Sequence, residues 1–455
     1  MPLRPWRHTC GISLRESSPI GFSSTTVPQT ARALRPRRRD NTVDTSSLNR
    51  VLDIDVSKKT EPNVPMDTLV AATLKAGLVP LVVMEFPGIT VGGGFSGTSG
   101  EKDGPFWGAA SAFGTLGVAT LLEVQLREAK PYVQVTYSLH ERVTGANAKI
   151  REEIAKEPVD YVDGIMFSKG STVVCSGRLA ERLPEGTRPR RFTRSTDPWF
   201  FVHVRRLQNR LRSSASAETT EFVPLVDYLF RYDRGGVWVA KYSFRYFFTP
   251  FNRITRFLLD PLMHTRTMYR ALRQSGLADY YLVQVPHDKV FEFVDWLHDA
   301  LPSTRYGYFL FADLEPGSDA SWLMNFGIWG PGLSDRREFM RQNRALEQKV
   351  QRLGGKKWLY AHTYYTEAEF WAHYDRESYD DVRAKYGAAW MMSVYDKVKV
   401  DIGAEERELR RRMPWLSALF WSIWPPRGLF GILMTLLGGD YLLKTANQAQ
   451  TLKEN

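Results

Sequence analysis

The chain has 455 residues, of which 43% are hydrophobic, so it can bury at least one large core and is long enough for two or more domains. This composition excludes an intrinsically disordered protein. Lysine and arginine outnumber aspartate and glutamate by 61 to 50, and the formal charge of +11 suits a membrane surface, a nucleic acid or a phosphorylated cofactor. The two cysteines, Cys10 and Cys175, are too few for a disulfide framework or a cysteine-rich metal site, so we expect a reducing compartment.

Residues 1–40 are set apart by their arginine content. Residues 1–39 carry eight arginines, no lysine and a single acid, Glu16, which is typical of a mitochondrial transit peptide. No amphipathic helix can be recognised there, so we interpret the segment as a disordered N-terminus and keep targeting as the alternative. No uninterrupted apolar run in the chain reaches the roughly 18–20 residues of a membrane-spanning helix, and integral insertion is therefore not expected.

Residues 63–100 predict a helix, a strand and then a glycine-rich loop. Pro65 suits a first helical turn, Gly77 is a natural stop, and Leu78–Phe86 is apolar enough for a buried strand. Residues 92–100 contain five glycines, which allow positive φ and let backbone N–H groups approach an anion. The segment therefore predicts a phosphate-binding loop, and a glycine-rich hairpin without a ligand stays open as the alternative. Residues 92–97 also match the G-x-G-x-x-G pattern of nicotinamide-binding domains, but turn residues follow where that pattern requires a helix.

A second glycine-bearing segment, Phe113–Val118, precedes a strand expected over residues 119–126. From about Lys130 the chain becomes aromatic and basic, with mixed helices and strands and few glycines. We therefore place a domain boundary between residues 129 and 130. Residues 188–214 are rich in arginine and aromatics and are expected to be partly loop.

The C-terminal segment, residues 401–455, is amphipathic. Arg410–Arg412 precede two apolar runs, Trp415–Trp424 and Leu429–Leu437, and the prolines of Pro425–Arg427 between them would break a helix. Each run is too short to span a bilayer, but tryptophan suits the headgroup boundary and arginine attracts anionic lipid. We predict monotopic binding to a membrane surface. The alternative is that both runs pack as ordinary core.

Several blocks of sequence occur in an order that matches a known family. In the first part of the chain the blocks are residues 61–64, 85–94, 97–101 and 106–118, and further on they are residues 228–235, 249–256, 263–266, 358–371 and 395–398. Together they resemble the FAD-dependent sterol delta-24 reductases of the vanillyl-alcohol-oxidase-type flavoprotein superfamily, over about residues 41–445. The resemblance implies an α+β fold: an FAD-binding domain over residues 41–129, incomplete relative to the family, and an α+β substrate cap domain over residues 130–400.

The same resemblance implies ligands and site residues. FAD would be the cofactor, NADPH the reductant and a sterol the substrate, in a membrane-associated protein of the endoplasmic reticulum, with mitochondrial residence as the alternative. The implied flavin contacts are Gly92, Gly93, Gly94, Gly97, Thr98 and Ser99, with a second backbone contact at Gly114, Thr115, Leu116 and Gly117.

The sequence departs from the family pattern at three places, one of which is the shorter and altered stretch of residues 283–313. Residues 30–39 offer no glycine where the family has a glycine-rich phosphate loop, and few residues separate Glu101 from Phe106 where the family has a longer segment. An incorrectly spliced gene model and genuine loss would each explain these departures. They leave a second function open, that of a non-catalytic, membrane-associated relative that has lost FAD binding.

Reduction of an olefin needs a hydride donor at one carbon and a proton donor near the other. The candidate proton donors are His362, Tyr364 and Tyr365, on a run expected to be a strand, where His362 and Tyr364 would share one face. The alternative is ordinary aromatic packing in the cap domain. Tyr395 and Lys397 form a weaker pair. We find no metal-ligand spacing, and we do not favour nucleic-acid binding through the arginines of residues 188–212.

Overall fold

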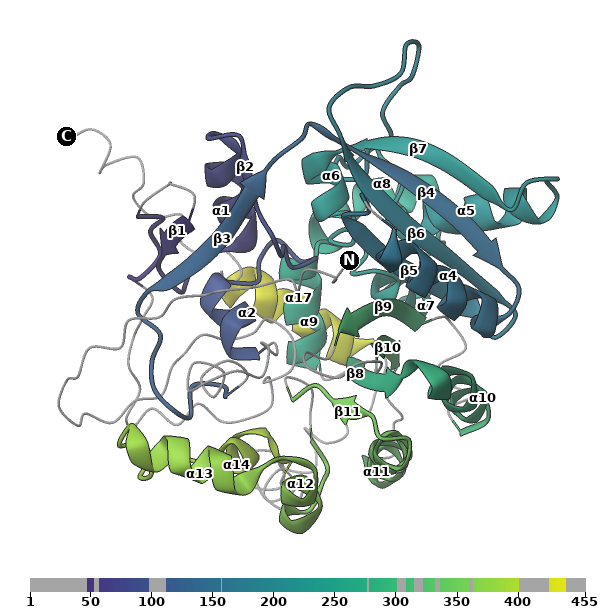
Figure 1. The fold of residues 1–455 in the computed structure, drawn as a ribbon. Helices are drawn as coiled ribbons and strands as arrows, with labels where there is room; N and C mark the ends of the chain where they lie inside the picture. Colours follow the sequence, from purple (N-terminus) through teal and green to yellow (C-terminus); the bar gives the residue numbers. More distant parts are fainter. Residues whose placement is uncertain are drawn as a thin grey trace.

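The computed structural model describes residues 47–52, 57–97, 112–156, 158–275, 278–300, 308–314, 322–331, 336–359, 363–400 and 425–438. These residues form helices and two antiparallel sheets, in agreement with the predicted α+β class (Figure 1). The strands are β1 (Ser57–Thr60), β2 (Leu78–Pro80), β3 (Leu122–Glu128), β4 (Tyr132–His140), β5 (Tyr161–Ser168), β6 (Ser171–Ala180), β7 (Glu218–Pro224), β8 (Ala278–Pro286), β9 (Tyr308–Leu314), β10 (Trp322–Pro331) and β11 (Lys356–Lys357). The helices are α1 (Met66–Leu74), α2 (Val91–Gly97), α4 (Val143–Ala155), α5 (Phe200–Arg212), α6 (Leu225–Leu229), α7 (Val239–Tyr246), α8 (Arg253–Leu258), α9 (Thr265–Ser275), α10 (Val290–Ala300), α11 (Arg336–Arg352), α12 (Glu367–His373), α13 (Arg376–Lys385), α14 (Val394–Val398) and α17 (Pro426–Gly438).

The larger sheet has eight strands in the order β11-β8-β10-β9-β5-β6-β4-β7, and helices cover both of its faces (Figure 1). Successive side chains of a strand point to opposite faces. In β4, therefore, Val133, Val135 and Tyr137 share one face, and all three are fully buried in the core that includes α5 and α6. On the opposite face, Met166 and Val174 pack in a second core with α4, α10 and α11.

A buried cation ties α6 to the larger sheet. The Arg231 guanidinium lies 3.9 Å from the ring centre of Tyr228 and 4.5 Å from that of Tyr232. It also forms an ion pair with Asp163 of β5. Cation–π and ion-pair contacts together compensate for the removal of this charge from water.

The smaller sheet, β1-β3-β2, packs against α1 at the upper left of Figure 1. The predicted helix is confirmed as α1, and Gly77 behind it has φ +72°, as a helix stop requires. The predicted strand Leu78–Phe86 is wrong beyond Pro80, since β2 ends there and Val82 is 62% exposed. The expected boundary near Lys130 falls between β3 and β4, and it stays a prediction.

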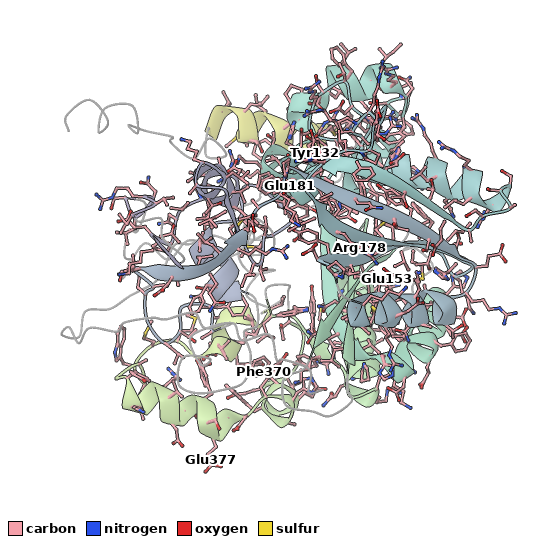
Figure 2. All side chains as sticks on the ribbon, turned by 45° about the horizontal axis from the view of Figure 1, so that its top comes forward. Tyr132, Glu153, Arg178, Glu181, Phe370 and Glu377 are labelled. Atoms are coloured by element: carbon pink, nitrogen blue, oxygen red, sulfur yellow. The ribbon has the colours of Figure 1, made fainter. Side chains whose placement is uncertain are left out.

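Helices α12, α13 and α14 form a separate layer at the lower left of Figure 1. Phe370 points into this layer and is fully buried, whereas Glu377 lies on its outer surface (Figure 2). Pro426 begins α17, a position that proline favours, which agrees with the expected helix break at Pro425–Arg427. The apolar run Trp415–Trp424 lies outside the described residues. Among the helices that the structure describes, none combines the length and apolar character that crossing a bilayer requires.

Candidate functional site

The glycine-rich segment is helical over its described part, so the prediction of a loop is wrong there. The N–H group of Gly92 donates to the carbonyl oxygen of Pro62 at 2.7 Å. The N–H groups of Gly93 and Gly94 donate to the side-chain and carbonyl oxygens of Thr90, at 3.1 and 2.8 Å. These three donors are thus used within the chain.

Close packing explains why glycine occupies these positions. A Cβ atom on Gly92 would lie 2.5 Å from Cβ and 2.9 Å from the carbonyl oxygen of Pro62, and one on Gly94 would overlap the side chain of Met84. The space beside these glycines is therefore filled by protein. Three engaged N–H groups and filled space do not fit a flavin diphosphate, and we assign no flavin contact to them. Of the other implied contacts here, Gly97 ends α2, while Thr98 and Ser99 lie outside the described residues.

The second implied flavin segment forms a tight turn against α2. Phe113 has φ +55° and Gly114 φ +70°, and the N–H group of Phe113 donates to the carbonyl oxygen of Ser96 at 3.1 Å. A positive φ is costly for a phenylalanine and persists only where the surrounding structure imposes it. Thr115 is buried, with its hydroxyl donating to the Ala112 carbonyl at 2.7 Å. Beyond the turn, Leu116 is half-buried and Gly117 is exposed.

This turn meets residues from the far end of the chain. The hydroxyl of Tyr379 donates to the Thr115 hydroxyl at 2.9 Å, across a separation of 264 residues. The ammonium of Lys397 donates to the Phe113 carbonyl oxygen. Phe113 also belongs to one buried cluster with Tyr365 and Tyr395. The structure thus brings the second implied flavin segment together with a predicted catalytic tyrosine.

Tyr365 is the predicted proton donor that lies in this cluster. Its side chain is 4% exposed, and its backbone carbonyl accepts a hydrogen bond from the Tyr395 hydroxyl at 3.3 Å. Within the described part of the chain, the Tyr365 hydroxyl has no hydrogen-bond partner. Burial raises the pKa of Tyr365 far above its usual value of 10, and the negative charge of Glu347 raises this pKa further. The phenol is therefore neutral and retains its proton.

Tyr364 points into a different cluster, on the side of α11. Its N–H group donates to Glu347 at 3.0 Å, and the ammonium of Lys357 lies 5.6 Å from its ring centre. Glu347 and Lys357 form an ion pair of 2.5 Å with both side chains almost fully buried. Tyr364 and Tyr365 therefore belong to different buried clusters, and a catalytic role for either of them stays a prediction.

The run that carries these tyrosines is not a regular strand, which corrects a second expectation. Thr363 makes a single parallel bridge to Lys399, and the residues up to α12 are irregular. His362 lies outside the described residues. The weaker pair, Tyr395 and Lys397, belongs to α14. Lys397 donates to the Phe113 carbonyl oxygen, and Tyr395 lies in the same buried cluster as Phe113.

His264 occupies a charged structural position. Its ring nitrogens lie 2.6 Å from Asp233 and 3.3 Å from Asp260. Burial lowers its pKa, but the hydrogen bonds and charges of the two aspartates outweigh burial and raise the pKa to about 9. The imidazolium form therefore persists at neutral pH, which suits a structural cation better than a proton-transfer group.

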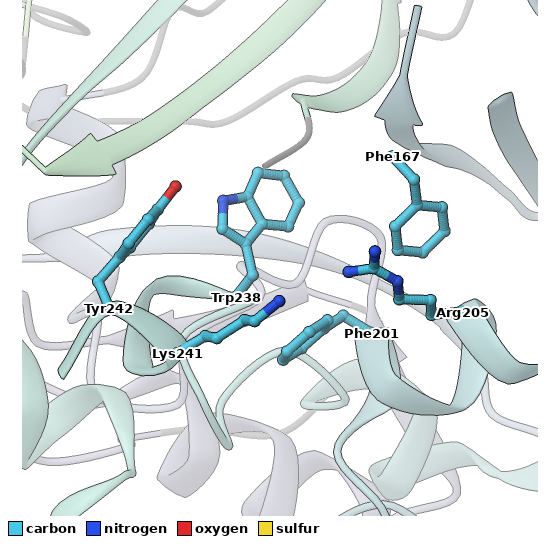
Figure 3. A pocket seen from close by; sticks show the side chains of 6 residues that line it. All are labelled: Phe167, Phe201, Arg205, Trp238, Lys241 and Tyr242. Carbon is cyan, nitrogen blue, oxygen red and sulfur yellow. The ribbon is translucent and has the colours of Figure 1, made fainter. Parts of the chain in front are cut away.

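A pocket lies away from these residues, between β5, α5 and α7 (Figure 3). It encloses about 290 Å³, counting the open space at its mouth, and is lined by Phe167, Phe201, Arg205, Trp238, Lys241 and Tyr242. Burial, and secondarily the charge of Arg205, lower the pKa of Lys241. None of the predicted site residues lines it. Residues 188–214 were expected to be partly loop, and this is confirmed, since residues 188–199 are irregular and α5, which forms one wall of the pocket, begins at Phe200.

Sequence comparisons place the chain among named proteins. No family model matches it. It is 24% identical over 410 residues to the Delta(24)-sterol reductases of Macaca fascicularis and Homo sapiens, an alignment that covers 77% of this chain and 76% of each relative. It is 25% identical over 453 residues to the Delta(24)-sterol reductase of Arabidopsis thaliana, covering 80% of this chain and 77% of that relative. The chain is therefore similar, over about three quarters of its length, to proteins named Delta(24)-sterol reductase, which are oxidoreductases.

Proposed function

We propose that this chain reduces the side-chain delta-24 double bond of a sterol, with FAD as cofactor and NADPH as the source of electrons. The names of its relatives support the sterol and the type of reaction. The structural observation that carries the proposal is the meeting of Phe113–Thr115 with Tyr365, Tyr379 and Lys397 in one buried region. These segments are remote in sequence, and a shared site would account for their contact.

In this reaction a hydride adds to one carbon of the double bond and a proton adds to the other. The role that the described residues support is that of proton donor. Tyr365 is neutral, buried and without a hydrogen-bond partner among the described residues, so its O–H group is available to an acceptor. Tyr395 would act as a positioning residue, because its hydroxyl holds the Tyr365 backbone at 3.3 Å.

FAD enters the proposal through the family resemblance alone. The N–H groups of Gly92, Gly93 and Gly94 are bonded within the chain, and we derive no reaction step through the flavin. Purified protein that carries flavin, or takes it up when FAD is added, would support this part of the proposal. Flavin retained by a Gly97→Val variant would argue against a flavin contact at α2.

The whole proposal is tested with purified protein, a delta-24 sterol in detergent, FAD and NADPH, with the product identified by mass spectrometry. We expect a sterol two hydrogens heavier and the consumption of one NADPH per sterol. Absence of both flavin and turnover would instead identify a non-catalytic relative. Turnover without flavin would leave the sterol assignment in place and refute the cofactor.

We further propose that the protein associates with a membrane surface, at the endoplasmic reticulum, because its sterol substrate would be dissolved in a bilayer. The charge of +11 supports this assignment. Cell fractionation with organelle markers tests it, and enrichment with mitochondria would favour the targeting interpretation of residues 1–40.

A further inference from the structure

Helix α8 has its polar and apolar sides reversed. A surface helix normally buries apolar residues and exposes charged ones. Here Arg256 is buried, with its guanidinium 4.9 Å from the ring centre of Phe251 and 5.8 Å from that of Trp199. The apolar residues Ile254, Phe257 and Leu258 are 69%, 48% and 67% exposed.

The reversal is secured by local structure. The Asn252 side chain caps α8 by accepting hydrogen bonds from the N–H groups of Ile254 and Thr255 at 2.9 and 3.0 Å. In return, the Thr255 hydroxyl accepts a hydrogen bond from the backbone N–H group of Asn252. An N-cap of this kind stabilises the start of a helix. The cap and the buried Arg256 together hold the apolar side of α8 in solvent.

A further apolar side chain is exposed just beyond the end of α7. Phe248 is 77% exposed and has φ +50°, a conformation that helix ends normally give to glycine. This conformation closes α7, because the N–H group of Thr249 donates to the carbonyl oxygen of Phe244 at 2.8 Å. A large apolar ring thus occupies an exposed position where glycine would be expected.

The beginning of α17 lies beside the end of α7, since a Cβ atom on Gly428 would lie within 2.6 Å of both Tyr246 and Phe247. The outward side of α17 is apolar as well. Its exposed residues are Leu429, Leu433, Met434, Leu436 and Leu437. Exposed apolar side chains thus occur on α8, at Phe248 and on α17.

Cations outnumber acids around α7 and α8. Residues 233–260 contain five cations, namely Arg234, Lys241, Arg245, Arg253 and Arg256, and two acids, Asp233 and Asp260, which are buried and paired with His264 and Arg234. Arg245 and Arg253 are exposed beside the apolar residues. Burial, and then the charges of Arg206, Arg234 and Arg253, lower the pKa of Arg256.

We propose that Phe248, Ile254, Phe257 and Leu258, called here the docking face, insert into the headgroup region of an anionic lipid bilayer, with Arg245 and Arg253 contacting lipid phosphates. Apolar side chains bordered by arginine are the composition of an interfacial membrane helix. The inference rests on the membrane association proposed above, and it places the contact on α7 and α8 of the predicted cap domain rather than on Arg410–Arg412.

The test is flotation of the full chain with vesicles of phosphatidylcholine, alone or with one-fifth phosphatidylserine. Replacing Ile254, Phe257 and Leu258 together by serine should weaken partition into the phosphatidylserine vesicles about tenfold or more. Arg253→Glu should weaken binding to those vesicles and reduce its dependence on salt. Phe291→Ser is the matched control, because Phe291 is 54% exposed on α10, and this variant should bind like the wild type.

Thermal melting by circular dichroism checks each variant, and Ile254→Ser and Leu258→Ser singly replace the triple variant if that variant fails to fold. Wild-type binding by the folded variants would overturn the proposal, as would a wild-type chain that binds neither type of vesicle. If light scattering shows that the serine variant only abolishes self-association, the face contacts a second copy and the proposal is wrong. Turnover of detergent-dissolved sterol is measured separately, so loss of docking can be distinguished from loss of the proposed activity.

Discussion

Replacing Tyr365 by phenylalanine removes one hydroxyl and separates catalysis from folding. Within the described residues this hydroxyl has no hydrogen-bond partner, and its side chain is 4% exposed. A buried polar group without a partner costs about 1–3 kcal/mol. Its removal should therefore leave the free energy of unfolding unchanged or raise it by up to about 1 kcal/mol. If Tyr365 supplies the proton, kcat/KM for the sterol should fall about 10²–10⁴-fold.

Urea denaturation and steady-state turnover are the two measurements. The matched control is Tyr395→Phe, which removes the 3.3 Å hydrogen bond to the Tyr365 backbone and should cost about 0.5–1.5 kcal/mol of stability with a smaller loss of turnover. Wild-type turnover by Tyr365→Phe would refute the role of proton donor. A loss of more than about 1.5 kcal/mol of stability in Tyr365→Phe would show that the hydroxyl has a partner after all.

Three further predictions concern stability. Lys357→Met leaves Glu347 charged and buried, so chemical denaturation should show a loss of about 3–5 kcal/mol, most of it recovered by adding Glu347→Leu. Gly92→Ala should lower the melting temperature more than Gly94→Ala, because the first collides with backbone and the second with the flexible side chain of Met84; equal effects would contradict the packing explanation. The pKa of His264 is raised from 6.5 to about 9, so its stabilising contribution is complete below pH 6.5 and is lost as pH rises through about 9. The melting temperature of the wild type should therefore fall over this pH range more steeply than that of a His264→Gln variant. Equally steep falls would contradict this role of His264.

Local features of the fold could be predicted from the sequence where nearby residues decide the structure. The helix before Gly77 follows from its own apolar spacing, its first-turn proline and its glycine stop. The glycine segment could not be predicted in this way, because glycine permits a loop and a helix alike. What selects the helix is contact with Pro62 and Met84, and neither contact is visible in the local pattern.

The candidate site shows the same limit. Tyr364 and Tyr365 are adjacent, so an expected strand places their side chains on opposite faces, but the local sequence does not identify α11 and Phe113 as their respective neighbours. The contact between Tyr379 and Thr115 joins residues 264 positions apart, and no sequence motif predicts that these two residues meet. The buried ion pair of Glu347 and Lys357 could not be predicted from the sequence either, because charged residues on a helix and a short strand are normally exposed to solvent.

The backbone geometry at Phe113 helps to distinguish a chain that retains a catalytic site from a non-catalytic relative that has lost it. Its left-handed conformation costs of order 1–3 kcal/mol, which a chain under selection for stability alone would relieve by placing glycine there. The conformation is held from both directions, because the N–H group of Phe113 donates to Ser96 and its carbonyl accepts from Lys397. The same small region buries the Tyr365 hydroxyl without a partner among the described residues, a second cost that packing alone would remove. Exceptions to folding rules are expected where function requires them. The left-handed Phe113 and the buried Tyr365 hydroxyl are two such exceptions. Both lie at the only place in the described structure where the second implied flavin segment meets a predicted catalytic residue.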